Sequence, residues 1–227
     1  MKVLVLDIGG THVKLRAEGQ AAPSKFVSGP TMTPADMVEG VKRLASGWRF
    51  DVMAIGYPGP VLQGHPVGEP HNLGAGWVGF DFAAAFGCPL QLTNDAAMQA
   101  LGGYRGGKML FLGFGTGLGT AMVVGGDVEP MELGHLPFRK ATFEDYVGAR
   151  GLARYGKKKW RERVGQVVAT LVAATRPDDV LLGGGNAALL KTPPAGCRIG
   201  SNEDAYLGGL RMWHGAPTQT QPTAAVR

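Results

Sequence analysis

The chain has 227 residues, of which 44% are hydrophobic and 18% charged, and its mean hydropathy is 0.00. This composition excludes a disordered chain. A chain of this size buries about 70% of its unfolded surface, so it needs no disulfide or metal ion to stabilise the fold. The two cysteines, Cys88 and Cys197, match no ligand spacing, which excludes a disulfide framework and a structural zinc site as organising features.

The net charge is +5, an excess that is typical of general surface charge, so no nucleic-acid partner is expected. No apolar run is long enough to cross a membrane, and the chain opens directly into a strand pattern without a cleavable signal. We therefore expect a cytoplasmic protein without a membrane partner. Glycine is unusually abundant, with 37 residues, and clusters where backbone must turn or approach a ligand.

The first half of the chain alternates strands and helices. Residues 2–6 and 13–16 predict a strand hairpin around a glycine turn, and Thr33-Pro34 predicts the start of a helix that runs to Gly47. Further predicted elements are a strand at 51–55, a long Gly- and Pro-rich loop at 60–79, a short helix at 81–86, a strand at 89–93 and a helix at 94–101.

The second half repeats the strand hairpin with its glycine turn about 107 residues later. Its predicted elements are strands at 108–114 and 118–124, helices at 142–155 and 157–175, a strand at 179–182 and a helix at 203–213. A duplicated hairpin within alternating strands and helices predicts an α/β protein with two lobes and a central cleft. We expect residues 1–94 with helix 203–213 to form one lobe, 95–202 the other, and 214–227 a flexible tail.

Two glycine turns carry a threonine beside the glycines: Asp7-Ile8-Gly9-Gly10-Thr11 and Gly115-Thr116-Gly117-Leu118-Gly119-Thr120. Such tips let several backbone N–H groups point at one anion, although a single tip is equally typical of an ordinary hairpin. Gly183-Gly184-Gly185 adds a flat surface that suits an adenine or a sugar face. Residues 102–109 resemble a P-loop, but Met109 replaces the Ser or Thr that binds Mg²⁺ and a strand follows, so that motif is rejected.

Several polar residues have both a structural and a functional interpretation. Asp95 follows a strand and precedes a helix, where it is either a helix cap or a general base facing a cleft. Glu132 and His135 flank a glycine and either form an ordinary hydrogen-bonded turn or converge on vicinal hydroxyls. The basic run at 157–161 is either a solvated helix start or a surface for a polyanionic ligand.

Six motifs in one order resemble the ROK family of sugar kinases and repressors, in the actin-like (ribonuclease-H-like) ATPase superfamily. They are residues 7–11, 56–60 (Gly-Tyr-Pro-Gly-Pro), 94–97 (Asn-Asp-Ala-Ala), 115–120, 132–135 (Glu-Leu-Gly-His) and 182–185. Asn72 with Trp77-Val78-Gly79, Phe114-Gly115-Thr116-Gly117 and Lys159-Trp160 are most similar to the polyphosphate glucokinase branch.

The resemblance implies a role for each matching position. Asp95 would be the catalytic base that takes the proton of a sugar 6-hydroxyl, and Asp7 would orient Mg²⁺ through water. The implied sugar-binding residues are Gly59, Asn72, Asn94, Asp95, Glu132, His135 and Glu144. The implied phosphate- or nucleotide-binding residues are Asp7, Gly9, Gly10, Thr11, Gly115, Thr116, Gly117, Gly119, Gly183, Gly184 and Gly185.

Departures from the family pattern are also informative. The span at 136–143 lacks the cysteine cluster of zinc-containing members, so no zinc is expected. The helix-turn-helix segment of the repressor members is not expected either. The chain is shorter than is usual for the family, and the missing residues fall near 19–24, between His135 and Glu144, and before Lys157. The sequence therefore does not decide whether the chain forms a homodimer.

The sequence therefore predicts a sugar kinase that transfers a phosphoryl group from ATP or polyphosphate, with Mg²⁺, to the 6-hydroxyl of glucose or a related hexose. Two alternatives are a catalytically silent sugar-binding regulator of the same fold and a kinase of an N-acetylated sugar. Its partners would be a small sugar and the phosphoryl donor.

Overall fold

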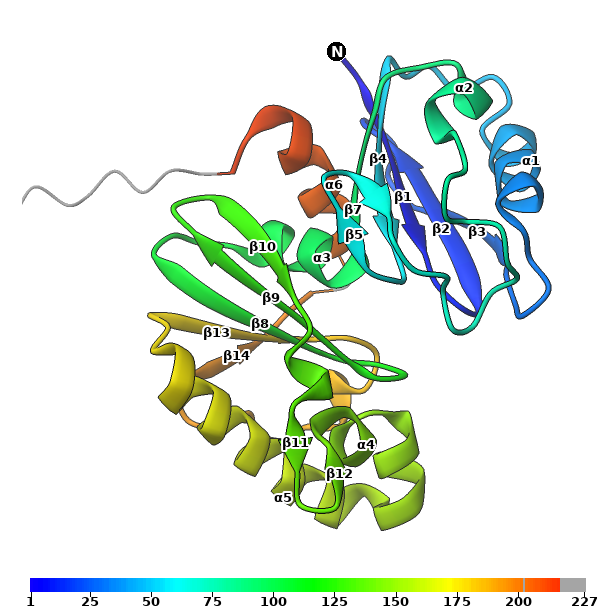
Figure 1. Cartoon of the computed structure of the whole chain (residues 1–227). Helices are drawn as coiled ribbons and strands as arrows, with labels where there is room; N and C mark the ends of the chain where they lie inside the picture. Colours follow the sequence, from blue (N-terminus) through cyan, green and yellow to red (C-terminus); the bar gives the residue numbers. More distant parts are fainter. Residues whose placement is uncertain (202, 217–227) are drawn as a thin grey trace, which may run out of the picture.

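Two five-stranded sheets of the same topology form the framework of the computed structural model, which describes residues 1–201 and 203–216 (Figure 1). The first sheet has the order β3-β2-β1-β4-β7 and the second has the order β10-β9-β8-β13-β14. In each, two antiparallel pairings are followed by two parallel ones. The duplication predicted for the opening hairpin thus extends to whole sheets.

The strands of the first sheet are β1 (Val3–Ile8), β2 (His12–Ala17), β3 (Ser24–Val27), β4 (Val52–Tyr57) and β7 (Leu90–Asn94). Those of the second are β8 (Lys108–Phe114), β9 (Leu118–Val124), β10 (Asp127–Met131), β13 (Asp179–Gly183) and β14 (Cys197–Ile199). Two small hairpins lie outside the sheets: β5 (Val61–Leu62) with β6 (His65–Pro66), and β11 (Pro137–Phe138) with β12 (Ala141–Thr142).

The helices are α1 (Pro34–Leu44), α2 (Phe82–Phe86), α3 (Asp95–Gly103), α4 (Phe143–Val147), α5 (Ala149–Thr175) and α6 (Asp204–His214), with short 3₁₀ turns η1 (Leu133–His135) and η2 (Ala187–Leu189). Thr33 caps α1 as predicted, through a reciprocal pair of bonds with Asp36. The predicted break between two long helices is a kink at Gly156, whose φ of +72° is non-helical.

All seven strands predicted from the sequence are present, with ends that differ by at most two residues. The strands β3, β10 and β14 were not predicted. Each is an outer strand with at least one exposed residue, so none carries the apolar run that marks a buried strand. Of the predicted tail at 214–227, residues 217–227 lie outside the described part of the chain.

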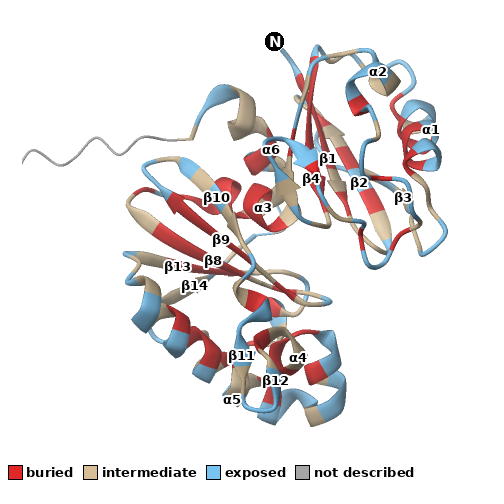
Figure 2. Cartoon of the chain, viewed as in Figure 1, coloured by how far each residue is buried: buried red, intermediate tan, exposed pale blue. Residues whose placement is uncertain are grey.

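Successive side chains along a strand point to opposite faces of its sheet, so each sheet has an outer face and an inner face that is turned towards α3 and α6. On β1, Leu4, Leu6 and Ile8 pack in the core with α1, whereas Val3 and Val5 pack against α6 on the opposite face. On β8, Leu110, Leu112 and Phe114 pack with α5 and its neighbours. Burial is concentrated on β1, β4, β8, β9 and α3 (Figure 2). Asp7 shares the inner face of Val3 and Val5, which directs its carboxylate towards the layer of α3 and α6.

The helices α3 and α6 lie together between the two sheets (Figure 1). Their backbones approach closely because glycines stand at the crossing: a Cβ at Gly102 would collide with the carbonyl of Asp204, and one at Gly208 with the carbonyl of Met98. Because α3 also contacts β4, β7, β8 and β9, its first residue stands where the two sheets meet. None of the helices in the described residues combines the length and apolar character that a membrane span requires.

Candidate active site

The first glycine turn, between β1 and β2, is held by a loop from elsewhere in the chain. The hydroxyl of Ser28 donates to the carbonyl of Gly9 at 2.5 Å, and the N–H of Ser28 donates to the carbonyl of Thr11 at 3.0 Å. A Cβ on Gly10 would lie 2.6 Å from the Cβ of Asn72, so only glycine lets that side chain sit on the turn. One predicted sugar ligand, Asn72, therefore lies directly against a predicted phosphate turn.

Asn94 forms the N-cap of α3 and anchors the loop that follows β4. Its Oδ1 accepts the N–H groups of Ala96 at 2.8 Å and Ala97 at 3.3 Å, and its Nδ2 donates to the carbonyl of Gly59 at 3.0 Å. Both ends of the amide are thus engaged in fixing backbone. The side chain holds Gly59 beside the first turn of α3, which begins with Asp95.

The carboxyl group of Asp95 has a strongly raised pKa. Burial is the largest cause that raises its pKa to about 7, and the charges of Asp7 and Glu132 raise it further. Its hydrogen bond from the N–H of Ala96, 2.7 Å long, acts in the opposite direction. Asp7 belongs to the first sheet and Glu132 follows the second, so Asp95 lies between acids of both lobes.

Two predicted sugar ligands of the second lobe, Glu132 and Glu144, converge on the imidazole of a third, His135. Nε2 of His135 lies 3.2 Å from a carboxylate oxygen of Glu132, and its Nδ1 lies 3.7 Å from one of Glu144. Glu132 directly precedes η1, His135 ends it and Glu144 belongs to α4; the side chains of Glu132 and His135 are about 60% exposed. A Cβ on Gly117 would collide with the carboxylate of Glu144, so the second glycine turn contacts this cluster directly. The cluster offers several acceptors to hydroxyl groups.

Thr120 positions this cluster and was not among the predicted site residues. Its buried hydroxyl donates to the carbonyl of Met131 at 2.6 Å and accepts the N–H of Leu133 at 3.1 Å. These two bonds bracket Glu132 and fix the turn that carries it. The sequence signal was present, since Thr120 ends the second glycine motif, but its inward position on β9 was not evident before the sheet was known.

The second glycine turn and the Gly183–Gly185 turn form one surface. Nδ2 of Asn186 donates to the carbonyl of Gly115 at 3.1 Å, and a Cβ on Gly184 would meet the backbone of Phe114. The N–H of Ala149, at the start of α5, donates to the carbonyls of Gly115 and Thr116 at 3.0 Å. Gly119 in turn packs against Ala96, where a Cβ would lie 2.8 Å from the alanine methyl carbon. This packing places β9 beside the first turn of α3.

The predicted metal residue, Asp7, has one ionic neighbour, Nζ of Lys14 at 3.5 Å, within the described residues. Burial raises the pKa of Asp7, and the nearby ammonium of Lys14 opposes this effect. A single carboxylate at the end of a strand fits Mg²⁺, which keeps most of its waters and binds chiefly to phosphate oxygens. Among the described residues no three His, Cys, Asp or Glu side chains form a metal-binding group. The absence of zinc stays a prediction.

A large hollow of the described residues lies elsewhere, with a volume of about 1290 Å³. It is open to solvent and is lined by β6, the start of α2, β7, the turn between β9 and β10, and the end of α6. It contains none of the predicted site residues. The volume of a hollow alone is therefore not evidence for the site of chemistry, and the polar groups around Asp95 make that region the candidate site.

The fold is the two-lobed actin-like ATPase fold, and the model of the ROK family matches residues 3–151. The chain belongs to the ROK family. The resemblance drawn from the six motifs is thereby confirmed.

Two curated relatives are polyphosphate glucokinases. The one from Mycobacterium leprae (strain TN) is 28% identical over 201 residues, and that match covers 81% of this chain and 59% of the relative. The one from Mycobacterium tuberculosis (strain CDC 1551 / Oshkosh) is 29% identical, with 81% and 72% covered. This chain therefore spans about three fifths of the M. leprae protein.

Among solved structures, the inorganic polyphosphate/ATP-glucomannokinase from Arthrobacter sp. strain KM superposes with a TM-score of 0.79 at 20% identity. The match covers 91% of this chain and 96% of that one. The two chains therefore share one fold over almost their whole lengths.

Proposed function

We propose that this chain is a ROK-type sugar kinase that transfers a phosphoryl group from ATP or polyphosphate to the 6-hydroxyl of glucose or a related hexose. The observation that carries the proposal is Asp95, a carboxyl group with a pKa of about 7 between acids of the two lobes. Support also comes from the polyphosphate glucokinases among its relatives. A regulator that only binds sugar would have no use for a base held in this environment.

Asp95 would act as the general base. A base is most effective when its pKa lies near the working pH, because it is then ionised yet still accepts a proton from the attacking hydroxyl. Burial and the neighbouring charge of Asp7 bring the pKa of Asp95 into this range from the ordinary value of 3.8. Proton removal by a positioned carboxylate contributes about 10²–10⁴ in rate.

The sugar would be held by acceptors on one side and backbone on the other. Glu132, His135 and Glu144 form a cluster of polar groups in the second lobe, and Asn72 and Gly59 would complete the pocket from the loops of the first. Asn94 would act both as a sugar ligand and through the backbone that it fixes. Such a set holds the 6-hydroxyl in the geometry for attack, which replaces a costly bimolecular encounter.

The phosphoryl donor would occupy the glycine turns. Gly9, Gly10 and Thr11 of the first lobe and Gly115 to Gly119 of the second present backbone at two hairpin tips, and the Gly183–Gly185 turn adjoins the second tip. Mg²⁺ bound to the donor near Asp7 would neutralise charge on the phosphate oxygens. Approach of the lobes, divided as residues 1–94 with helix 203–213 and residues 95–202, would exclude water from the transfer.

The test is a kinase assay on the purified chain with glucose, in which ATP and polyphosphate are supplied in parallel and glucose 6-phosphate is measured. The proposal expects turnover with at least one donor and strict dependence on sugar. A panel with mannose and N-acetylated sugars identifies the acceptor. Saturable sugar binding without any phosphorylated product from either donor would replace the kinase with a sugar-binding regulator.

A further inference from the structure

One segment accounts for the whole net positive charge of this protein. Residues 139–163 contain nine Lys and Arg and three Asp and Glu, a net charge of +6, whereas the whole chain has a net charge of +5. The rest of the chain therefore carries a net charge of −1. General surface charge would be spread over both lobes, so this concentration needs a local explanation.

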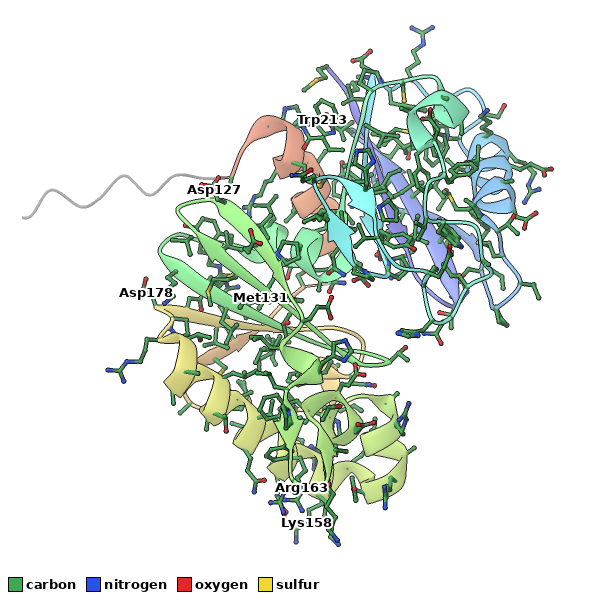
Figure 3. All side chains as sticks on the ribbon, in the orientation of Figure 1. Asp127, Met131, Lys158, Arg163, Asp178 and Trp213 are labelled. Carbon is green, nitrogen blue, oxygen red and sulfur yellow. The ribbon has the colours of Figure 1, made fainter. Side chains whose placement is uncertain are left out.

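The segment forms one surface of the second lobe, which we call the basic surface. It comprises the turn between β11 and β12 and the part of α5 that follows the kink at Gly156, with the exposed residues Arg139, Lys140, Lys157, Lys158 and Lys159 and the half-buried Arg163. Side chains of both parts meet, because Arg139 and Arg163 contact the same residue, Gln166. Lys158 and Arg163 lie together at one end of this lobe (Figure 3).

The cations of the basic surface are not compensated by acids. The guanidinium groups of Arg139 and Arg163 both donate to Oε1 of Gln166, at 3.1 Å each. Within the described residues, none of the six residues of the basic surface has a carboxylate oxygen within 4.0 Å of its charged nitrogen atoms. Nε of Arg163 is also buried without a hydrogen-bond partner. Cations gathered in this way repel one another and are stabilised by a bound anion.

The helix itself makes this arrangement costly. The kink at Gly156 begins a new helical segment, and Lys157, Lys158 and Lys159 occupy its first turn. Unpaired N–H groups give a helix start a partial positive charge, so three ammonium groups there are unfavourable. The same combination of N–H groups and ammonium groups is favourable for phosphate.

The basic surface is joined to both halves of the proposed site. Along the chain, Arg139 stands four residues beyond His135, at most about 14 Å away for an extended segment, and the hairpin then returns to Glu144. From the other side, the indole of Trp160 donates to the carbonyl of Val147 at 2.7 Å and packs edge-on against Phe114, which precedes the second glycine turn. Arg161 donates to the carbonyl of Leu189, at the end of η2, at 2.7 Å.

We propose that the basic surface formed by Arg139, Lys140, Lys157, Lys158, Lys159 and Arg163 binds the distal part of a long polyphosphate chain whose reacting end lies at the glycine turns. The inference rests on the proposed kinase function and specifies its donor. Polyphosphate fits because it is a flexible polyanion with a charge on every unit, whereas the triphosphate of ATP ends at the glycine turns. Binding of a polyanion to such a surface releases counterions and weakens steeply with salt.

The test compares pairs of charge-removing variants. Arg139→Gln with Lys140→Gln, and Lys157→Gln with Lys158→Gln, each remove two exposed charges from the basic surface. Lys42→Gln with Arg43→Gln removes two exposed charges from α1 and is the matched control. Equilibrium binding of long-chain polyphosphate and of tripolyphosphate is measured at several salt concentrations, together with glucose phosphorylation from ATP and from both polyphosphates.

Each basic-surface pair is expected to weaken the binding of long-chain polyphosphate roughly tenfold at moderate salt and to flatten the salt dependence. The KM for ATP and the binding of tripolyphosphate stay as in the control. Equal affinities of these pairs and the control for the long chain overturn the inference. The inference is also overturned if the unaltered chain phosphorylates glucose from ATP but does not bind long-chain polyphosphate. It is overturned as well if the chain binds duplex DNA or RNA as tightly as polyphosphate. Long-chain binding that is lost in the variants, without any glucose phosphorylation by the unaltered chain, supports the surface and overturns the kinase function instead.

Discussion

Nδ2 of Asn94 donates to the carbonyl of Gly59 at 3.0 Å, while Oδ1 of the same side chain caps the helix that begins with Asp95. One amide therefore ties a loop of the first lobe to the residue proposed as the base. Because the two functions use opposite ends of the amide, the position of Asp95 depends on the whole side chain and not only on its capping oxygen.

Asn94→Ala should lower both stability and turnover. The loss of the cap costs about 1–2 kcal/mol in the free energy of unfolding, measured by denaturant titration. The kcat for sugar phosphorylation should fall at least tenfold, because the first turn of α3 and Gly59 are no longer held. Thr33→Ala, which removes the cap of α1 away from the site, is the control. It should cost a similar free energy with unchanged kcat, and a parallel loss of kcat in both variants would contradict the specific role of Asn94.

Asp95→Asn should abolish turnover without disrupting the fold. Loss of the base lowers kcat by about two or more orders of magnitude, while the dissociation constant for glucose, measured by calorimetry, changes little. The folded state of the unaltered chain holds the proton of Asp95 up to about pH 7, whereas the unfolded state releases it near the ordinary value of 3.8. The free energy of unfolding therefore falls as the pH rises between these values.

The same substitution consequently predicts a gain in stability at alkaline pH. Above pH 7 the unaltered chain must keep an ionised carboxylate in a poorly solvated place, and the asparagine does not. Asp95→Asn should be more stable by about 4 kcal/mol at pH 8 and nearly indistinguishable near pH 4. A variant that retains most of the activity would remove Asp95 from its proposed role.

Asp7→Asn should shift the pH dependence of catalysis. With Asp95 as base, kcat falls as the pH decreases below about 7, where its carboxylate becomes protonated. The charge of Asp7 contributes to that raised pKa, so its removal should move the acidic limb of the profile to lower pH. Full pH profiles of kcat separate this shift from any drop in the maximum rate. An acidic limb that does not move would show that Asp7 exerts no such influence.

Thr120→Val should weaken sugar binding through the turn that carries Glu132. The variant loses the bonds to Met131 and Leu133, which costs about 1–3 kcal/mol in stability because both backbone groups lose their partner. The KM for the sugar should rise more than the KM for the donor. Thr120→Ser keeps the hydroxyl and should restore both constants; failure of serine to do so would indicate that the methyl group matters more than the bonds.

Gly208→Ala should separate α3 from α6. A methyl group there collides with the carbonyl of Met98, which is backbone and cannot move without shifting the helix, so we expect a loss of about 3 kcal/mol or more. Gly165→Ala is the matched control, since the same change on α5 meets no atom within 4 Å. There the better helix former should add about 0.5–1 kcal/mol. Thermal unfolding of the two variants should therefore change in opposite directions.

Much of the fold was evident from local patterns. Apolar runs that end in glycine turns predicted β1, β4, β8 and β13, and the Thr33-Pro34 pair predicted the start of α1. The outer strands β3, β10 and β14 were missed, because a half-exposed strand carries mixed residues and gains its stability from a neighbour distant in sequence.

The candidate site was likewise predicted only in part from the sequence. The order of six short motifs in the sequence determined the ROK resemblance, the identity of the proposed ligands and the choice of Asp95. The sequence left open whether Asp95 is a cap or a base, and only the tertiary structure brings the charges of Asp7 and Glu132 to it. The roles of Thr120 and Ser28, and the union of residues 139–163 into one surface, also depend on contacts between distant segments. Residue type and spacing are local properties, but burial and the field of other charges exist only once the chain has folded.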